Sequence, residues 1–120
     1  MSNPNDANTY IRRGLVYQNI GNCIKAINDY DKALEINPGL SMIYVNKGDC
    51  HVSLNKYNDA ILDYNDAIKY NPNNEELYLN RAKIYFKLNS RDLAIEDVKR
   101  AAKLGHKDSQ NDLKKAGIDW

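Results

Sequence analysis

Hydrophobic and small residues recur along the chain with the spacing of amphipathic helices. Near the N-terminus, Tyr10, Gly14 and Tyr17 lie three or four residues apart, so they share one helical face. A second run with the same spacing begins at Ala26 and includes Tyr30. Strands would show a sustained alternation of polar and apolar residues, which the sequence does not contain. The pattern therefore predicts an all-α protein.

The helical pattern returns at an interval of 34 residues. Asn37-Pro38 is followed 34 residues later by Asn71-Pro72, and the chain laid over itself at this offset matches in residue size and polarity. The matched sets are Tyr10/Tyr44/Tyr78, Gly14/Gly48/Ala82, Ala26/Ala60/Ala94, Tyr30/Tyr64/Val98 and Ala33/Ala67/Ala101. Small residues on the inner faces predict that two helices approach closely in each unit. Such helix pairs cover their apolar faces only when several of them stack.

The repeat positions predict how the chain is divided. The expected segments are a flexible N-terminus at 1–6, repeats at 7–40, 41–74 and 75–108, and a capping helix with a tail at 109–120. The capping helix is expected over 109–116, with Leu113 on its apolar face and Gly117 at its end. A final helix with one polar face is the usual end of a stacked array.

Residues of helix-terminating types stand at the expected helix ends. Gly and Asn tolerate the left-handed conformation that commonly follows a helix. Such residues follow the first helix of each unit, at Gly21, Asn55 and Asn89. The candidate N-caps of the first helices are Asn5, Gly39 and Asn73.

A charged pair with a separation of sixteen residues recurs in every unit. The pairs are Arg13 with Asp29, Lys47 with Asp63, and Arg81 with Asp97. The two members of each pair fall on the two helices of one unit. We predict an ion pair between the helices in each unit, and the alternative is two independent solvated stripes of charge.

Composition limits the classes of function. Hydrophobic residues make up 42% and charged residues 28% of the chain, which is typical of a folded globular protein. The net charge of +1 provides no general field for nucleic acid or an anionic membrane. No apolar run reaches the length of a membrane span, and the N-terminal residues lack a signal pattern. These features predict a cytoplasmic protein that binds neither nucleic acid nor membrane.

Candidate chemical sites are few. Cys50 and His51 are adjacent, so on a helix they point about 100° apart and suit a common metal ion poorly. His51 occupies the position of Tyr17 and Tyr85, which predicts a packed, hydrogen-bonded histidine. Cys23 begins a second helix, and the sequence suggests no partner for it. Nucleophile, phosphate-binding and metal motifs are missing, so we predict no catalytic, cofactor or metal residues.

These features together resemble the tetratricopeptide repeat family. The resemblance is carried by Tyr10-x3-Gly14-x2-Tyr17, by Ala26-x3-Tyr30-x2-Ala33 with Pro38, and by the same scheme from Tyr44 to Pro72. The third unit departs from it, with Ala82, Val98 and no proline. The resemblance implies a right-handed superhelical array of three antiparallel helix pairs whose first helices line a concave groove. It further implies a protein-interaction adaptor or scaffold, and not an enzyme.

Helical geometry indicates which residues would line this groove. They lie one step around each first helix from the packing face. The predicted groove residues are Ile11, Arg12, Leu15, Met42, Val45, Asn46, Asp49, Val52, Leu79, Asn80, Lys83 and Phe86. Asn46 and Asn80 can donate to and accept from an extended peptide backbone, or they are ordinary polar residues on a solvated face. The groove charges nearly cancel, so an apolar or amphipathic segment is the favoured ligand.

One subclass of the family binds the acidic C-termini of heat-shock chaperones through a clamp of lysines, asparagines and an arginine. Of these residues only Asn46 is matched here. The other clamp positions carry Ile11, Leu15, Glu76 and Asn80, and a glutamate would repel a carboxylate. We therefore predict that the chain does not bind such acidic tails. The alternative function is a self-assembling structural protein, with contacts through Trp120 or the N-terminal helix.

Overall fold

The computed structural model describes residues 6–120. The flexible segment predicted at 1–6 therefore lies, except for Asp6, outside the described residues. Within these residues the chain forms helices and no strands, which confirms the predicted all-α class. The helices are α1 (Ala7–Asn19), α2 (Cys23–Ile36), α3 (Ser41–Ser53), α4 (Tyr57–Tyr70), α5 (Glu75–Lys87), α6 (Arg91–Lys103) and α7 (Lys107–Lys115).

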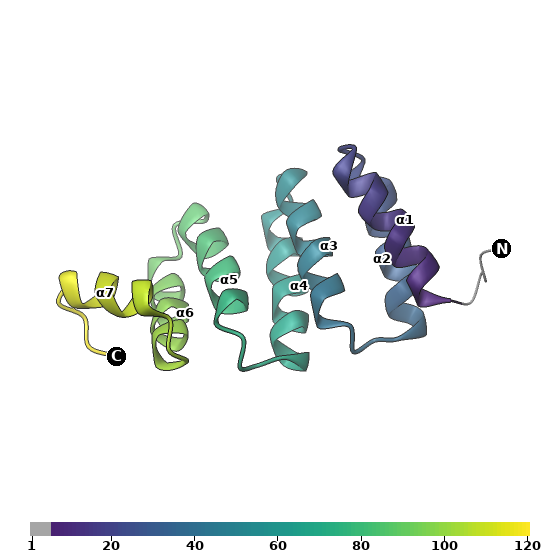
Figure 1. Ribbon diagram of the computed structural model, residues 1–120. Helices are drawn as coiled ribbons and strands as arrows, with labels where there is room; N and C mark the ends of the chain where they lie inside the picture. The colour runs from purple at the N-terminus through teal and green to yellow at the C-terminus, as the bar shows by residue number, and fades with distance from the viewer. Residues whose placement is uncertain (1–5) are drawn as a thin grey trace. The chain divides into compact units, whose positions relative to one another are not determined.

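The helices group into two compact units (Figure 1). The N-terminal unit ends at Tyr70 and contains α1 to α4, and the C-terminal unit, Asn71–Trp120, contains α5 to α7. In the N-terminal unit α1 packs against α2, α3 against α4, and α2 also against α3. In the C-terminal unit α5 packs against α6, and α6 against α7. Each unit is therefore built from the predicted helix pairs, and the repeat boundaries themselves stay a prediction.

The predicted helix-ending residues have the expected conformation. Gly21, Asn55 and Asn89 have φ values of 84°, 59° and 58°. The backbone N–H of the next residue then bonds back into the last turn, as in the contact of 2.7 Å from Asn22 N to the Tyr17 carbonyl. Each first helix is thus closed by a sharp turn that directs the chain into the second helix.

The predicted N-caps of the first helices were wrong by one residue where they can be compared. α5 is capped by Asn74 and not by Asn73, because the Asn74 side chain accepts from the N–H of Glu76. α3 begins after Leu40 and not after Gly39, and it has no side-chain cap. α1 is capped by Asp6, whose side chain accepts from the N–H of Asn8, and not by Asn5, which itself lies outside the described residues. Adjacent asparagines offer the same side-chain acceptor, so residue type alone does not choose between them.

The last helix begins two residues earlier than the sequence predicts, at Lys107. His106 is its N-cap, and the His106 Nδ1 atom accepts from the N–H of Ser109 at 3.1 Å. Leu113 is buried, as expected for the apolar face of a final helix. A histidine is an uncommon N-cap, so residue type gave no signal for a helix start at this position.

Close packing between paired helices depends on glycine in the N-terminal unit. A Cβ atom built at Gly14 would lie 2.6 Å from Tyr30 Cε1, and one at Gly48 would lie 2.7 Å from Tyr64 Cε1. Both distances are shorter than any real carbon contact. The tyrosine rings of the second helices therefore occupy the space that a side chain would need, which confirms the predicted role of the small residues.

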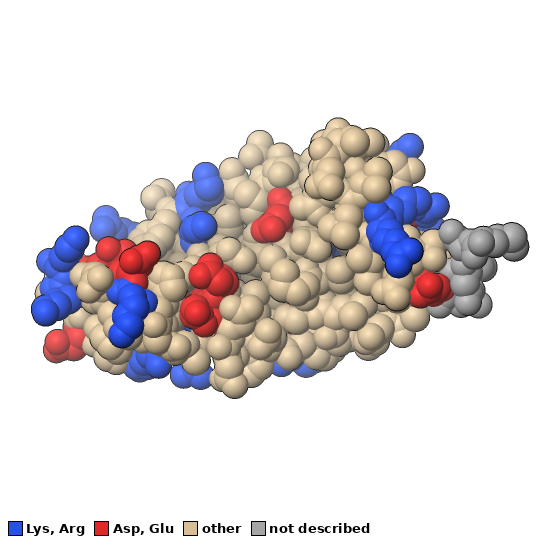
Figure 2. Space-filling model, viewed as in Figure 1, with Lys and Arg blue, Asp and Glu red and all other residues tan. Residues whose placement is uncertain are grey.

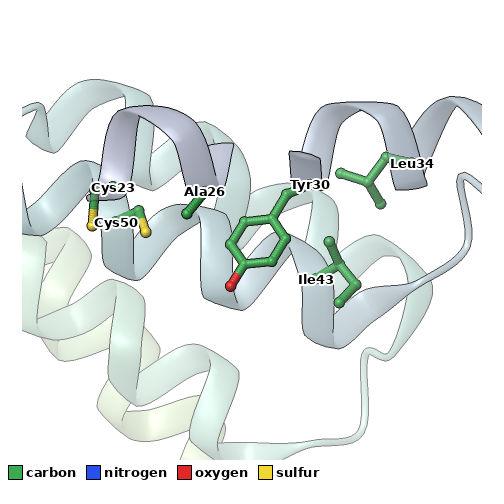
Figure 3. Close-up of a cluster of buried hydrophobic side chains, with 6 residues drawn as sticks. All are labelled: Cys23, Ala26, Tyr30, Leu34, Ile43 and Cys50. Carbon is green, nitrogen blue, oxygen red and sulfur yellow. The ribbon is translucent and has the colours of Figure 1, made fainter. Parts of the chain in front are cut away.

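The core of the N-terminal unit joins its two helix pairs. A cluster of buried side chains lies between α2 and α3 (Figure 3). Its members are Cys23, Ala26, Tyr30, Leu34, Ile43 and Cys50. Because α2 contributes to this cluster and also packs against α1, its position relative to both neighbours is set by burial of apolar surface.

Candidate peptide-binding surface

Two of the predicted charged pairs have the same bidentate geometry. Arg13 donates to Asp29 through Nε at 2.9 Å and Nη2 at 2.6 Å. Arg81 donates to Asp97 with the same two distances. Both aspartates are buried, so each carboxylate has exchanged water for a guanidinium. The aspartate raises the pKa of Arg81 through the hydrogen bond, and the same is true of Arg13 with Asp29.

The middle pair is also formed but has a different geometry. Lys47 Nζ lies 3.6 Å from Asp63 Oδ1 and 2.8 Å from Asp31 Oδ1 on α2. His51 Nδ1 contacts the other oxygen of Asp63 at 2.6 Å. All three predicted pairs are thus within ion-pair distance, and the ladder is confirmed. Each pair links the first helix of a repeat to its second helix.

The prediction for His51 is also confirmed. Its side chain is 13% exposed and hydrogen-bonded to Asp63. The other two repeats have Tyr17 and Tyr85 at this position. Burial raises the pKa of the Asp63 carboxyl, and His51 and Lys47 oppose this effect. The histidine therefore supplies a hydrogen bond to the second oxygen of a buried acid.

The N-terminal unit contributes eight of the predicted groove residues. Leu15 and Met42 are exposed at 38% and 58%, and Arg12 and Asp49 are exposed as well. Half-buried residues are Ile11, Asn46 and Val52. Val45 is only 6% exposed, so its side chain offers little surface to a ligand. Figure 2 shows a basic cluster over α1, whereas the surface over α3 is largely uncharged.

The C-terminal unit holds the remaining four predicted groove residues on α5. Phe86 is 45% exposed and Lys83 is exposed, while Leu79 and Asn80 are half-buried. Asn80 has the same register on α5 as Asn46 on α3. Each unit thus carries an apolar side chain, an amide and a charged residue on its first helices. That these residues form one groove stays a prediction.

Two tyrosine hydroxyls reach polar residues of the first helices, which sequence analysis missed. Tyr64 donates to Asp49 Oδ1 at 2.6 Å, and Tyr30 donates to Gln18 Oε1 at 2.5 Å. Burial raises the pKa of Tyr30 to about 12, so the hydroxyl stays protonated and remains a donor. These bonds fix the orientation of side chains beside the predicted groove. The acceptors vary between repeats, so the repeat pattern gave no signal for them.

The described residues contain no metal-binding cluster. No group of three or more His, Cys, Asp or Glu side chains in residues 6–120 could hold a metal ion. Every buried side-chain nitrogen and oxygen in this part of the chain has a hydrogen-bond partner. None of its helices combines the length and the apolar character that a membrane crossing needs.

Comparison with known families identifies this architecture. Models described as tetratricopeptide repeat match residues 7–40 and 75–104, and one described as TPR repeat matches residues 48–89. The chain belongs to the tetratricopeptide repeat family. Tetratricopeptide repeats generally mediate protein–protein interactions, and their fold is a scaffold that is not typically enzymatic. A comparison with curated proteins finds no significant match.

Solved structures show the same helical-repeat fold and identify the chain as an all-α solenoid. MamA matches with a TM-score of 0.80 and 22% identity over 86% of this chain, which spans only 60% of MamA. The first TPR of Spaghetti (RPAP3), bound to the HSP90 peptide SRMEEVD, matches with a TM-score of 0.79, 24% identity and coverage of 94% and 91% of the two chains. The Arabidopsis OM64 TPR domain matches with a TM-score of 0.78, 22% identity and coverage of 91% and 92%.

Proposed function

We propose that this chain is an adaptor whose first helices bind a peptide or a partner domain. The observation that carries the proposal is a set of exposed apolar side chains on those helices. Leu15, Met42 and Phe86 are 38%, 58% and 45% exposed, although each belongs to a helix whose other face is buried. Apolar surface that the fold leaves uncovered is a common feature of protein-interaction sites.

Backbone recognition by amides supports a peptide as the ligand. Asn46 and Asn80 are half-buried at equivalent positions, so part of each side chain is held by its surroundings and part is open to solvent. A carboxamide can both donate to and accept from an extended chain without requiring one sequence. We expect an apolar or amphipathic segment and a modest affinity, because ordering a flexible peptide offsets much of the contact free energy.

A pull-down with matched variants tests this proposal. Wild type is compared with the double variant Asn46→Ala/Asn80→Ala and with Asn28→Ala/Asn58→Ala, whose residues are exposed on the second helices. We expect the first double variant to lose partners that the control variant keeps. If all three proteins retain the same partners equally, binding does not use the amides of the first helices.

At the positions expected to contact the carboxylates of an acidic tail, the chain lacks the positive charges that would attract them. The related RPAP3 domain was solved with the HSP90 peptide SRMEEVD, which carries three acidic side chains. In this chain Glu76 is 64% exposed, with Oε1 3.9 Å from His106 Nε2, so its carboxylate is available to repel an anion. Ile11 and Leu15 provide no cation or amide. We propose that the ligand is not such a tail.

Titration with the SRMEEVD peptide tests the proposal that the chain does not bind acidic tails. By calorimetry we expect no binding at micromolar peptide concentrations. The charge-reversing variant Glu76→Lys is the sensitive comparison, because it removes the repulsion and should increase any residual affinity. Micromolar binding by wild type that Asn46→Ala abolishes would overturn the proposal.

Self-assembly is the second candidate function. Val16 on α1 is 58% exposed and lines a shallow hollow with Thr9 and Arg12, and Trp120 is 45% exposed. Either side chain could contact another copy of the chain. Light scattering over a range of concentrations separates the two functions. A mass that stays that of a monomer at high concentration argues against assembly, and a rise that Val16→Asp or Trp120→Ala removes supports it.

A further inference from the structure

The two cysteines of the chain meet in the core of the N-terminal unit. Cys23 is the first residue of α2 and Cys50 lies in the last turns of α3. Figure 3 shows their sulfur atoms next to each other at one end of the buried cluster. The neighbouring Cys23 contributes to the raised pKa of the Cys50 thiol, and both thiols are free. Residues that are distant in sequence thus bring two thiols side by side.

The repeat pattern does not demand cysteine at either position. The residues in register with Cys23 are Tyr57 and Arg91, and those in register with Cys50 are Val16 and Ile84. Other side chains therefore satisfy the same backbone positions elsewhere in this chain. Cysteine thus stands at both of two facing positions, although neither position requires it elsewhere in the chain.

We propose that Cys23 and Cys50 are an oxidation site that forms a reversible disulfide between α2 and α3. The oxidant is hydrogen peroxide, which the two thiols reduce. Cys23 reacts first, because it is 8% exposed at the start of a helix, whereas Cys50 is 0% exposed. Fraying of the first turn of α2 opens a path to the Cys23 sulfur and leaves Cys50 covered.

The reaction proceeds in two balanced steps. The Cys23 thiolate attacks one peroxide oxygen, so that an S–O bond forms, the O–O bond breaks and water leaves after proton uptake. The Cys50 sulfur then attacks the sulfenic acid of Cys23, so that the S–S bond forms and the S–O bond breaks, releasing a second water. Two thiols lose two electrons and two protons in total, and the peroxide is reduced to water.

The environment of Cys50 sets the rate of the second step. Burial and the neighbouring Cys23 raise the pKa of the Cys50 thiol, so it stays protonated at neutral pH. A protonated thiol is a poor nucleophile. The site should therefore oxidise slowly under mild conditions and faster at higher pH, as expected for a pair that responds to sustained and not to brief oxidation.

The bond would change the stability of the N-terminal unit. It would close the loop between Cys23 and Cys50, which contains most of α2, the connection and most of α3. Such a crosslink restricts the unfolded chain and ties the first helix pair to the second. Oxidation should therefore raise the Tm, and a reducing agent should return it to its original value.

Mass spectrometry of the whole 120-residue chain treated with hydrogen peroxide tests the site. We expect loss of two hydrogen atoms from the intact mass, and a link between the tryptic peptides 14–25 and 48–56. Dithiothreitol should reverse both changes. The control is Cys50→Val, which uses the residue found in register at Val16 and should yield only a sulfenic acid, its further oxidation products or linked dimers.

A glutathione equilibrium makes the test independent of access to the buried sulfur atoms. The ratio of disulfide to dithiol is measured at fixed glutathione composition, in the native chain and in urea. If the fold holds the sulfur atoms in place, the native ratio exceeds the unfolded one by at least about tenfold. A native ratio equal to or below the unfolded one, or sulfinic acids with no internal link, would overturn the proposal.

Discussion

The helix pairs α3–α4 and α5–α6 have different residues at the positions where their two helices pack closely. In α3–α4 a glycine faces a tyrosine, at Gly48 and Tyr64. The corresponding positions of α5–α6 hold Ala82 and Val98. Ala82 is tolerated because Val98 has no aromatic ring that would clash with its Cβ atom. A change on one helix is thus matched by a change on the other.

The charged pairs differ in a similarly coordinated way. Arg81 satisfies both oxygens of Asp97 with one guanidinium. Lys47 is a point charge and reaches one oxygen of Asp63, so the other needs a second donor. His51 supplies it, at the position where α5 carries Tyr85. Lys47 and His51, which break the repeat pattern together, thus contact the same carboxylate.

Replacing the buried aspartates should give the largest difference in stability between the two helix pairs. Asp97→Ala removes the buried carboxylate that accepts two hydrogen bonds from the Arg81 guanidinium. We expect a loss of about 2–4 kcal/mol in the free energy of unfolding, toward the lower end for a buried pair. Asp63→Ala should cost only about 1–2 kcal/mol, because Lys47 keeps its 2.8 Å contact with Asp31. Urea unfolding at neutral pH measures both, and equal losses would contradict the comparison.

The glycine contact gives the next largest effect. Gly48→Ala places a methyl group 2.7 Å from Tyr64 Cε1 and should destabilise the protein by about 1–3 kcal/mol through overpacking. The reverse change in the other pair, Ala82→Gly, creates no clash and should cost about 0.5–1 kcal/mol from the backbone alone. The decisive measurement repeats Gly48→Ala in a Tyr64→Val background, where its cost should largely disappear. A cost that persists there would mean that the ring is not the cause.

The charged residues between the helices show which contacts can be predicted from the sequence and which cannot. The sixteen-residue spacing predicted the Arg13–Asp29 pair, because both residues repeat and helical geometry relates them. The bond from Lys47 to Asp31 was not predicted, since it joins neighbouring helix pairs and the sixteen-residue spacing within one repeat gives no information about it. Burial of Val45 was missed for a related reason. Helical periodicity predicts the face of the helix on which a side chain lies. How deeply that side chain is buried depends on the position of the next helix.

Exchange of residues between the pairs should show that Lys47 and His51 act together. His51→Tyr alone removes the bond to Asp63 Oδ2 and should cost about 1 kcal/mol. Adding Lys47→Arg reproduces the Arg–Tyr combination of α5 and should recover most of that loss. A double-mutant cycle in urea measures the coupling, which we expect to be about 0.5–1.5 kcal/mol. Additive effects would show that the histidine is not a substitute for the missing arginine donor.

The smallest effect is a dependence of stability on pH that arises at Asp63. Burial raises the pKa of this carboxyl above its ordinary value of 3.8, despite the opposing His51 and Lys47. Between 3.8 and the raised value the folded chain therefore holds a proton that the unfolded chain has released. Stability contributed by this group must then increase as the pH falls through that interval, the reverse of the behaviour of an acid whose pKa is depressed. We expect wild type to gain stability relative to Asp63→Asn on acidification, measured by urea unfolding from neutral pH downward. A relative loss on acidification would mean that the His51 and Lys47 contacts outweigh burial, and that the middle pair stabilises its acid as fully as an arginine does.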